Sequence, residues 1–153
     1  MYDILCNTLI TNGFTQYEVS NFSKPNHHSQ HNSAYWRHIP YLGLGAAAHS
    51  FDGKSRQWNI NDVESYIEQV RSGSLQTEKE ILTSTDLYNE KIMLSLRTTT
   101  GLELSELNDQ QKSLITKAQP FIDKGFLSIN DNRLMVTQEG FHILDYITRE
   151  LMI

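Results

Sequence analysis

The side chains that could carry chemistry are concentrated in one stretch of the sequence, from Tyr17 to Gly53. This stretch combines hydrogen-bonding and aromatic side chains, namely those of His28, His31, Asn32, Tyr35, Trp36, His38 and His49. Polar groups and stacking surfaces beside small residues, which leave room for close approach, are what a ligand pocket needs. The rest of the sequence resembles a helical scaffold, so we expect any chemistry in the first third of the chain.

Two short motifs within this stretch are typical of binding surfaces. A strand that ends in Asn21 and Ser23 would present small polar groups at the edge of a sheet where α/β proteins bind ligands, although a turn at a strand end explains them equally well. His31, Asn32, Tyr35 and Trp36 could together orient a planar ligand by stacking and a few hydrogen bonds. The alternative is that the two aromatic residues seal the edge of a domain.

Two other patterns in the same stretch are weaker signals. His27, His28, His31 and His38 lie close in sequence, but no cysteine or acidic residue accompanies them at ligand spacing, so a solvated turn is favoured over a metal site. The run from Gly43 to Ser50 is rich in small residues but lacks both the GxGxxG spacing and the lysine of a phosphate-binding loop. Close packing of a buried strand explains it at least as well. We predict no metal site and no catalytic residue in this chain.

Composition limits the classes of function. The 153 residues are enough for one or two small domains, and a net charge of −5 without a basic run disfavours nucleic-acid binding. No apolar run approaches the roughly 20 residues of a membrane span, and the first residues lack the basic head of a secretory signal. Cys6 is the only cysteine, which predicts a reducing, cytoplasmic location. One cysteine also cannot supply the several thiolates of an iron–sulfur cluster.

The hydrophobic pattern predicts a mixed first half. We expect a helix over residues 2–12 ending at Gly13, and a strand over 14–22 that makes a helix–strand unit with it. After a polar loop we expect a short helix at 32–38, a strand buried on both faces at 41–51, and a strand at 56–60. A helix capped by Asn61 or Asp62 should then run to Val70, and a linker should follow at 73–81.

The second half predicts a winged-helix-like module. We expect a helix ending at Leu96, a break at Gly101, a short helix at 104–107, and a helix at 110–124 that Pro120 kinks or shortens. A hairpin of strands 126–129 and 133–136 should follow, and then a last helix from Thr137 to Leu151. Winged helices often bind DNA, but the charges here are mixed, so packing or recognition of a partner is favoured.

Three segments taken together resemble one family. YEVSNFSKP spans 17–25, HN is followed by YW within 31–36, and YLGLGAAAHSFDG spans 41–53. This combination resembles the oxygen-independent coproporphyrinogen III oxidase-like (HemN/HemW) proteins of the radical SAM superfamily, and the HemW-like haem-chaperone branch more closely. The resemblance implies an α/β (α+β) fold, in which residues 1–60 are the end of the radical SAM barrel, 61–80 a helix and linker, and 81–153 a HemN C-terminal-type winged-helix-like domain.

The resemblance also implies roles for individual residues. Asn21, Ser23, His49 and Ser50 would face the cavity for S-adenosylmethionine (SAM) and substrate, and His31, Asn32, Tyr35 and Trp36 become candidates for binding haem or a porphyrin. Arg56 and Asn59 match a further pattern of the family and would fix their strand by hydrogen bonds. The family often has Pro-Ser where this chain has Ala46-Ala47, so a polar contact at position 47 is not expected.

By the same resemblance the whole protein would bind a [4Fe–4S] cluster and SAM, and would handle haem or a porphyrin precursor. The cluster-binding CxxxCxxC motif is missing from this sequence, so we expect the chain alone to be catalytically inactive. Its expected partners are an N-terminal radical SAM barrel and, because a partial barrel leaves sheet edges open, a second copy in a homodimer or swapped assembly. The residues do not separate oxidase from haem chaperone, and a non-enzymatic winged-helix module that binds protein or nucleic acid remains the alternative.

Overall fold

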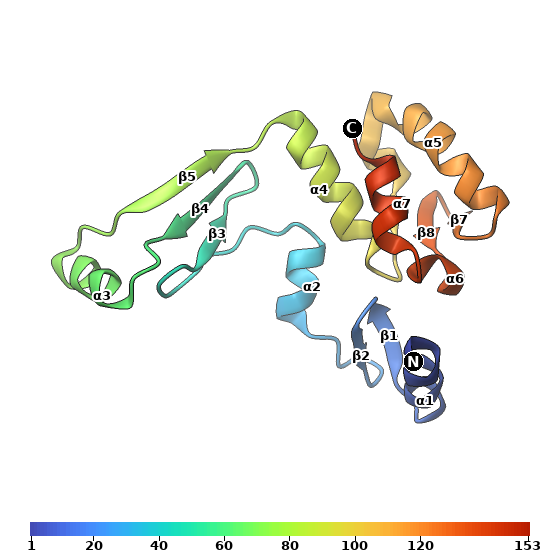
Figure 1. Cartoon of the computed structure of the whole chain (residues 1–153), viewed down its shortest axis with the longest axis horizontal. Coiled ribbons are helices and arrows are strands. Elements are labelled where there is room, and N and C mark those ends of the chain that lie inside the picture. The colour runs from blue at the N-terminus through green and yellow to red at the C-terminus, as the bar shows by residue number, and fades with distance from the viewer. The chain divides into compact units, whose positions relative to one another are not determined.

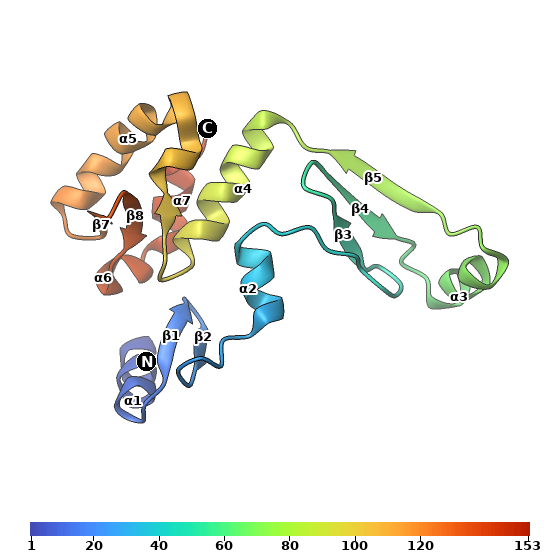
Figure 2. The ribbon, with the colours of Figure 1, turned by 180° about the vertical axis from the view of Figure 1, so that it is seen from behind.

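A computed structural model describes all residues, 1–153, as two compact units. The first unit combines 1–37 with 88–153, and the second comprises 38–87. Figures 1 and 2 show the same chain from opposite sides. Helices and three small antiparallel sheets occur together, which confirms the predicted α/β class. The predicted domain limits at 60 and 80 stay a prediction. None of the helices is long and apolar enough to span a lipid bilayer.

The C-terminal part of the first unit follows the predicted winged-helix order. Helix α4 (Ser84–Leu96), whose first turn belongs to the other unit, leads into strand β6 (Leu102–Glu103), a 3-10 helix η1 (Leu104–Gln110) and helix α5 (Gln111–Asp123). Strands β7 (Leu127–Asn130) and β8 (Arg133–Val136) form the predicted hairpin, and β8 lies in the middle of the sheet order β6-β8-β7. Asp131 and Asn132 both have positive φ, which the two-residue turn between antiparallel strands requires.

This sheet and the surrounding helices bury a leucine-rich core. Its largest fully buried side chains come from four helical segments and three strands of the module and are Ile92, Leu96, Leu102, Leu104, Leu114, Leu127, Leu134, Ile147 and Leu151. Gly101 is required by the backbone at this point: its φ is +66° and an added Cβ would collide with the carbonyl group of Leu134. Burial of so many branched side chains in one cluster makes this module the most strongly stabilised part of the chain.

Pro120 does not shorten α5, which continues to Asp123, and a kink at this residue stays a prediction. The prediction of a single last helix was wrong. The last helix is divided into α6 (Gln138–Phe141) and α7 (Leu144–Leu151). Thr137 caps α6 as expected, by accepting a hydrogen bond from the backbone N–H of Gly140 (3.1 Å). The division occurs because Ile143 leaves the helical region, with φ −124° and ψ 23°.

The N-terminal part of the first unit is a helix and a hairpin. Helix α1 (Tyr2–Thr11) is confirmed, but the single strand predicted at 14–22 is wrong. Strands β1 (Thr15–Glu18) and β2 (Asn21–Ser23) instead pair antiparallel around a turn at Val19 and Ser20. The side chain of Glu18 accepts hydrogen bonds from the backbone and hydroxyl of Ser20, which closes a turn that lacks glycine or proline. Helix α2 (Gln30–Trp36) follows, capped by Ser29.

The second unit is a three-stranded antiparallel sheet with one helix. Its strands β3 (His49–Phe51), β4 (Ser55–Asn59) and β5 (Thr77–Ile81) lie in the order β3-β4-β5. Helix α3 (Val63–Ser72) begins at the predicted cap Asp62, which accepts from the N–H of Ser65 (2.8 Å), and ends at Gly73 with φ +69°.

Two predictions for this unit were wrong. The strand expected over 41–51 is confined to β3, because residues 41–48 form a loop in which Ala47 has φ +57° and Leu42 and Leu44 are exposed. The linker expected at 73–81 contains β5, an edge strand whose residues are all exposed. Edge strands are often polar because charged side chains discourage pairing with other chains, so polarity alone did not separate this strand from a linker.

The core of the C-terminal module gives the first testable prediction. Replacing fully buried Leu134 of β8 by alanine removes three carbon atoms from a tightly packed site, so we expect the free energy of unfolding to fall by about 2–5 kcal/mol. Urea denaturation followed by circular dichroism measures the change. The matched control is Ile129→Ala on β7, a branched residue that is 40% exposed, for which we expect a clearly smaller loss. Equal losses in the two variants would contradict this placement of the core.

Candidate functional site

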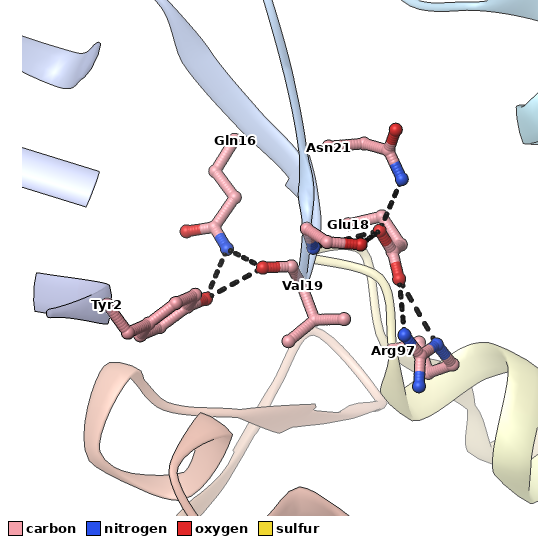
Figure 3. Close-up of polar contacts among 7 residues, drawn as sticks. Tyr2, Gln16, Glu18, Val19, Asn21 and Arg97 are labelled. Atoms are coloured by element: carbon pink, nitrogen blue, oxygen red, sulfur yellow. Dashed lines mark hydrogen bonds and ion pairs between the residues drawn. The ribbon is translucent and has the colours of Figure 1, made fainter. Parts of the chain in front are cut away.

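The centre of the candidate site is the carboxylate of Glu18, at the end of β1. This side chain is completely buried, and each of its oxygens has a separate set of donors. One oxygen, Oε1, accepts from Nε (3.1 Å) and Nη2 (2.9 Å) of Arg97 at the end of α4. The other, Oε2, accepts from the backbone N–H and hydroxyl of Ser20 (2.9 Å each) and from the amide of Asn21 (Figure 3). Five donors around one buried carboxylate make this a fully satisfied ion pair.

The titration of Glu18 follows from these contacts. Burial acts to raise the pKa of its carboxyl group, since it disfavours the charged form. The hydrogen bonds from Ser20, Asn21 and Arg97 outweigh burial, and they hold the pKa of Glu18 below its ordinary value of 4.5. The group is therefore ionised at neutral pH and accepts from all its donors as a carboxylate.

Arg97 links this ion pair to the aromatic motif on α2. Its guanidinium carbon lies 5.4 Å from the centre of the Trp36 ring, a cation–π contact. The indole nitrogen of Trp36 is buried and has no hydrogen-bond partner in the structure. The backbone joins the same segments, because the N–H of Val19 donates to the carbonyl of Arg97 (2.9 Å) and the N–H of Thr99 to that of Tyr17 (3.2 Å).

A second group of contacts attaches α1 to the same turn. The hydroxyl of Tyr2 (2.9 Å) and the amide of Gln16 (3.1 Å) both donate to the carbonyl of Val19 (Figure 3). Burial raises the pKa of Tyr2 above its ordinary value of 10, so the phenol keeps its proton and remains a donor. The ring of Tyr2 meets the ring of His142 edge-on, and His142 lies 3.0 Å from the carboxylate of Asp3.

A cavity of about 480 Å³ opens beside this turn. Its walls come from the turn, from the end of α4 and from the segment that joins α6 to α7, and they consist of Val19, Arg97, Phe141, His142, Ile143, Leu144, Asp145 and Tyr146. Although this cavity borders Arg97, it contains none of the residues that the sequence singled out.

Two histidines of the predicted cluster, His28 and His31, lie against aromatic rings. The ring of His28 stacks on Tyr17, with 4.6 Å between ring centres, and the ring of His31 meets Tyr35 edge-on at 4.8 Å. No group of three or more histidine, cysteine, aspartate or glutamate side chains comes together in a way that could hold a metal ion. These imidazoles therefore extend an aromatic surface over α2 and β1.

In the second unit, the loop from Gly43 to Ala48 is held by two predicted site residues. The hydroxyl of buried Ser50 accepts from the N–H of Gly43 (2.9 Å). The amide of buried Asn59 donates to the carbonyls of Gly43 (3.3 Å) and Gly45 (2.8 Å), and the N–H of Gly45 donates to the hydroxyl of Tyr66 (3.1 Å). Both side chains thus fix a loop whose small residues allow it to lie close to β3, since an added Cβ on Gly43 would collide with His49.

His49 lies at the wall of a second cavity of about 480 Å³. Its ring is tilted against Trp58, with 5.7 Å between ring centres, and the indole nitrogen of Trp58 donates to the carboxylate of Glu78 (3.0 Å). The cavity also includes Asn59. Arg56 lies on β4, opposite Phe51 of β3 and Glu80 of β5.

The structure thus divides the predicted site residues between the two units. Asn21, Ser23 and the four residues of the aromatic motif belong to the first unit, and His49, Ser50, Arg56 and Asn59 to the second. Asn21 and Trp36 contact the two halves of one ion pair, whereas buried Ser23 donates to the carbonyl of its neighbour Lys24 (3.0 Å). The binding roles of all these residues stay predictions.

Sequence reasoning missed Glu18 and Arg97, although Glu18 lies in the middle of a quoted motif. The available signal was that Glu18 is the only charged residue in the predicted strand 14–22, because a charge that becomes buried there needs a partner. The partner itself could not be identified, since Arg97 is 79 residues away along the chain.

The residues present can be tested against the cofactors that the resemblance implies. Iron–sulfur clusters need several thiolates, whereas this chain has only Cys6, which is buried on α1, so its donors do not fit a cluster. A haem needs one axial ligand and apolar or aromatic surroundings. His31 is exposed next to Tyr35, so the donor type fits haem iron.

Comparison with known proteins identifies the family. Residues 82–143 match the model of the HemN C-terminal domain. Heme chaperone HemW of Mycobacterium tuberculosis is 30% identical over 99% of this chain, and HemW of Bacillus subtilis is 28% identical over 92%. The mitochondrial radical S-adenosyl methionine domain-containing protein 1 of Danio rerio is 31% identical over the whole chain.

A solved structure shows the same fold. The coproporphyrinogen III oxidase HemN of Escherichia coli, a radical SAM enzyme, superimposes with a TM-score of 0.67 over 98% of this chain and 40% of its own, at 20% sequence identity. Most of the module described above thus matches the HemN C-terminal domain. The predicted resemblance to HemN/HemW-like proteins is confirmed over nearly the whole chain, which spans 38% of the length of the HemW relatives it matches.

The buried ion pair predicts a pH-dependent stability. A lowered folded-state pKa means that Glu18 stabilises the fold above pH 4.5 and that this contribution is lost as the pH falls through the folded-state pKa. Glu18→Gln should cost roughly 1.5–3 kcal/mol at pH 7, the contribution of hydrogen bonds to a charged group. The difference from the wild type should shrink at acid pH.

Urea denaturation at several pH values measures this effect. Other carboxylates with lowered pKa values, among them Asp52 and Glu103, weaken the wild type in acid as well, so only the difference between the two proteins is informative. The control is Glu103→Gln, which breaks the more exposed pair with Arg133 and should change stability little. A pH-independent difference for Glu18→Gln would contradict the assignment.

Proposed function

We propose that this chain acts as the C-terminal part of a HemW-like radical SAM protein that handles haem. The observation that carries the proposal is the match to HemW over 99% of the chain, which includes the YEVSN, HN-x-x-YW and AHS motifs as well as the C-terminal domain. A cytoplasmic location, predicted from the single cysteine, belongs to the same proposal.

Haem delivery is favoured over oxidation of a porphyrin precursor. The relatives called heme chaperone share 28–31% identity with this chain, whereas the oxidase HemN shares 20% and supports the fold alone. Both activities belong to a longer protein, so the decarboxylation of propionate side chains and the transfer of haem are attributed to the whole and not to these residues alone.

The haem-binding surface would be the aromatic motif on α2. His31 is exposed, so its imidazole can reach haem iron, and its edge-on contact with Tyr35 restrains its orientation. Tyr35 and Trp36 are partly buried and offer ring faces to a planar macrocycle, while Asn32 offers an amide one residue from the ligand. Haem supplies the redox-active iron; the chain binds it and holds its plane.

In the whole protein, Asn21 and Ser23 of the first unit, and separately His49 and Ser50 of the second, are the residues proposed to face SAM or substrate. Asn21 donates its amide N–H to Glu18 and keeps its carbonyl oxygen for a ligand (Figure 3). The hydroxyl of Ser50 is engaged by Gly43, so its role here is to shape the loop, and His49 is the member whose ring borders a cavity. Arg56 and Asn59 act as structural residues of the same loop and sheet.

Cluster and SAM chemistry would come from an N-terminal radical SAM barrel as partner. Exposed apolar residues on α1 support this view, because Ile4 is 71% and Leu5 50% exposed and such a face favours a covering segment. A second copy of the chain is the alternative partner. It would pair with the open edge of β2 in a homodimer or swapped assembly.

Haem binding is tested by titration. Adding hemin to the chain should shift the Soret band and saturate at one haem per chain, and His31→Ala should weaken this binding at least tenfold because the axial ligand is lost. The matched control is His27→Ala, an exposed histidine of the preceding loop that should leave the affinity unchanged. An identical Soret shift in His31→Ala and wild type would exclude His31 as the ligand.

The absence of cluster ligands is tested separately. Anaerobic reconstitution of this chain with iron and sulfide should give less than stoichiometric cluster and no reductive cleavage of SAM, because only one thiolate is present and it is buried. Absorbance near 400 nm and chemical iron and sulfide analysis measure it. Four irons and four sulfides per chain would overturn the proposal that the cluster lies elsewhere in the protein.

A further inference from the structure

We propose that Arg97 is a positioning residue for the aromatic surface on α2: its pairing with Glu18 docks the hairpin on the C-terminal domain and thereby sets the position of Trp36. The inference rests on the proposed function only in naming that surface as the haem site. All the contacts involved lie within the first unit.

The first step is that Arg97 contacts both sequence motifs at once. Its Nε and Nη2 atoms donate to Glu18 of the YEVSN turn, and its guanidinium carbon lies 5.4 Å from the centre of the Trp36 ring in the HN-x-x-YW motif. A guanidinium can make a forked hydrogen bond in its plane while stacking on a ring above that plane. Lysine has a compact, strongly hydrated charge and cannot do both, so the geometry requires arginine.

The second step is that the pairing is energetically obligatory for the docked state. Glu18 is fully buried, and a buried carboxylate without its counterion is strongly disfavoured. Other ion pairs in this unit are more exposed, such as Lys91 with Glu106 and Arg133 with Glu103. Only the Glu18–Arg97 pair joins residues from the N-terminal hairpin to the C-terminal domain through a completely buried group.

The third step concerns the backbone beside the pair. The N–H of Val19 donates to the carbonyl of Arg97, the N–H of Thr99 donates to that of Tyr17, and the side chain of Val19 packs against the C-terminal core. The hairpin therefore extends onto the segment between α4 and β6 as a short β-bridge. These two N–H groups report directly on docking, because they are protected only while the hairpin and the C-terminal domain are in contact.

The consequence for the binding surface follows from shared residues. Asn21 hydrogen-bonds the carboxylate of Glu18, and Trp36 lies under the guanidinium of Arg97, so each half of the ion pair contacts one predicted ligand-binding residue. Loss of the Arg97 side chain removes the cation next to the Trp36 ring. Glu18 then keeps only the hydrogen bonds from Ser20 and Asn21 in its own turn. The aromatic surface then loses its connection to the C-terminal domain while its own residues remain unchanged.

The experiment uses the full chain in a Trp58→Phe background, so that Trp36 is the remaining tryptophan. Arg97→Gln and Arg97→Lys are compared with the control Arg133→Gln, which breaks an ion pair inside the C-terminal domain. Hydrogen exchange should show a loss of protection at the amides of Val19 and Thr99 of roughly tenfold to a hundredfold in Arg97→Gln, the effect of a hydrogen bond to a charged group. Acrylamide quenching of Trp36 fluorescence should rise in both Arg97 variants. In the control, neither the exchange of these amides nor the quenching should change.

Each result decides the proposal. Faster exchange at Val19 and Thr99 together with stronger quenching of Trp36 supports it, with exchange in α5 unchanged as proof that the C-terminal domain remains folded. Faster exchange without a change in quenching overturns it, because docking would then not reach the aromatic surface. No change in either overturns it as well. If Arg97→Gln unfolds, as judged by circular dichroism, Arg97→Lys carries the same test. These readouts need no haem, so a failure of hemin binding would count against the proposed function alone.

Discussion

The first unit depends on a buried carboxylate that the chain itself cannot satisfy locally. Glu18 receives three hydrogen bonds from its own turn, and those alone would leave one oxygen without a donor inside the protein. Arg97, which follows a helix 79 residues further along the chain, supplies the missing donors and the compensating charge. Since burial without compensation is costly, the hairpin and the C-terminal domain are stable in contact and less stable apart. The winged-helix-like domain is therefore more than an appended module in this family member.

The two units are stabilised in different ways. The C-terminal domain has a large core of branched side chains, whereas the unit over 38–87 buries few apolar residues, chiefly Phe51 and Leu82. Its loop before β3 is held by polar side chains such as Asn59 and Ser50, and apolar residues including Val63 and Ile81 remain exposed. Hydrogen bonds contribute less per group than burial of branched side chains, so this unit is expected to open at a lower free energy than the C-terminal domain.

Much of this fold follows from local sequence rules. Asp62 and Gly73 define the two ends of α3, and Asp131 with Asn132 define the wing, because caps and tight turns depend on a few side chains and on positive φ. The rules failed where tertiary contacts decide the outcome. The turn at Val19 has no glycine or proline and is closed by Glu18, so residues 14–22 were interpreted as one strand. The small residues before His49 were also interpreted as a strand, although Asn59 holds them as a loop.

The candidate site shows the same division between what is local and what is distant. Asn21 and Trp36 could be singled out because they belong to compact motifs. The residue that connects them, Arg97, lies 79 positions beyond Glu18 and directly follows a helix of ordinary composition. A sequence pattern records which side chains are near each other along the chain, whereas an ion pair records which are near in space. Since Arg97 contacts both motifs, a change in either one alters the electrostatic surroundings of the other. Binding at the aromatic surface and docking of the C-terminal domain are then linked equilibria, and whichever ligand favours the docked arrangement of Trp36 must also strengthen that docking by the same free energy.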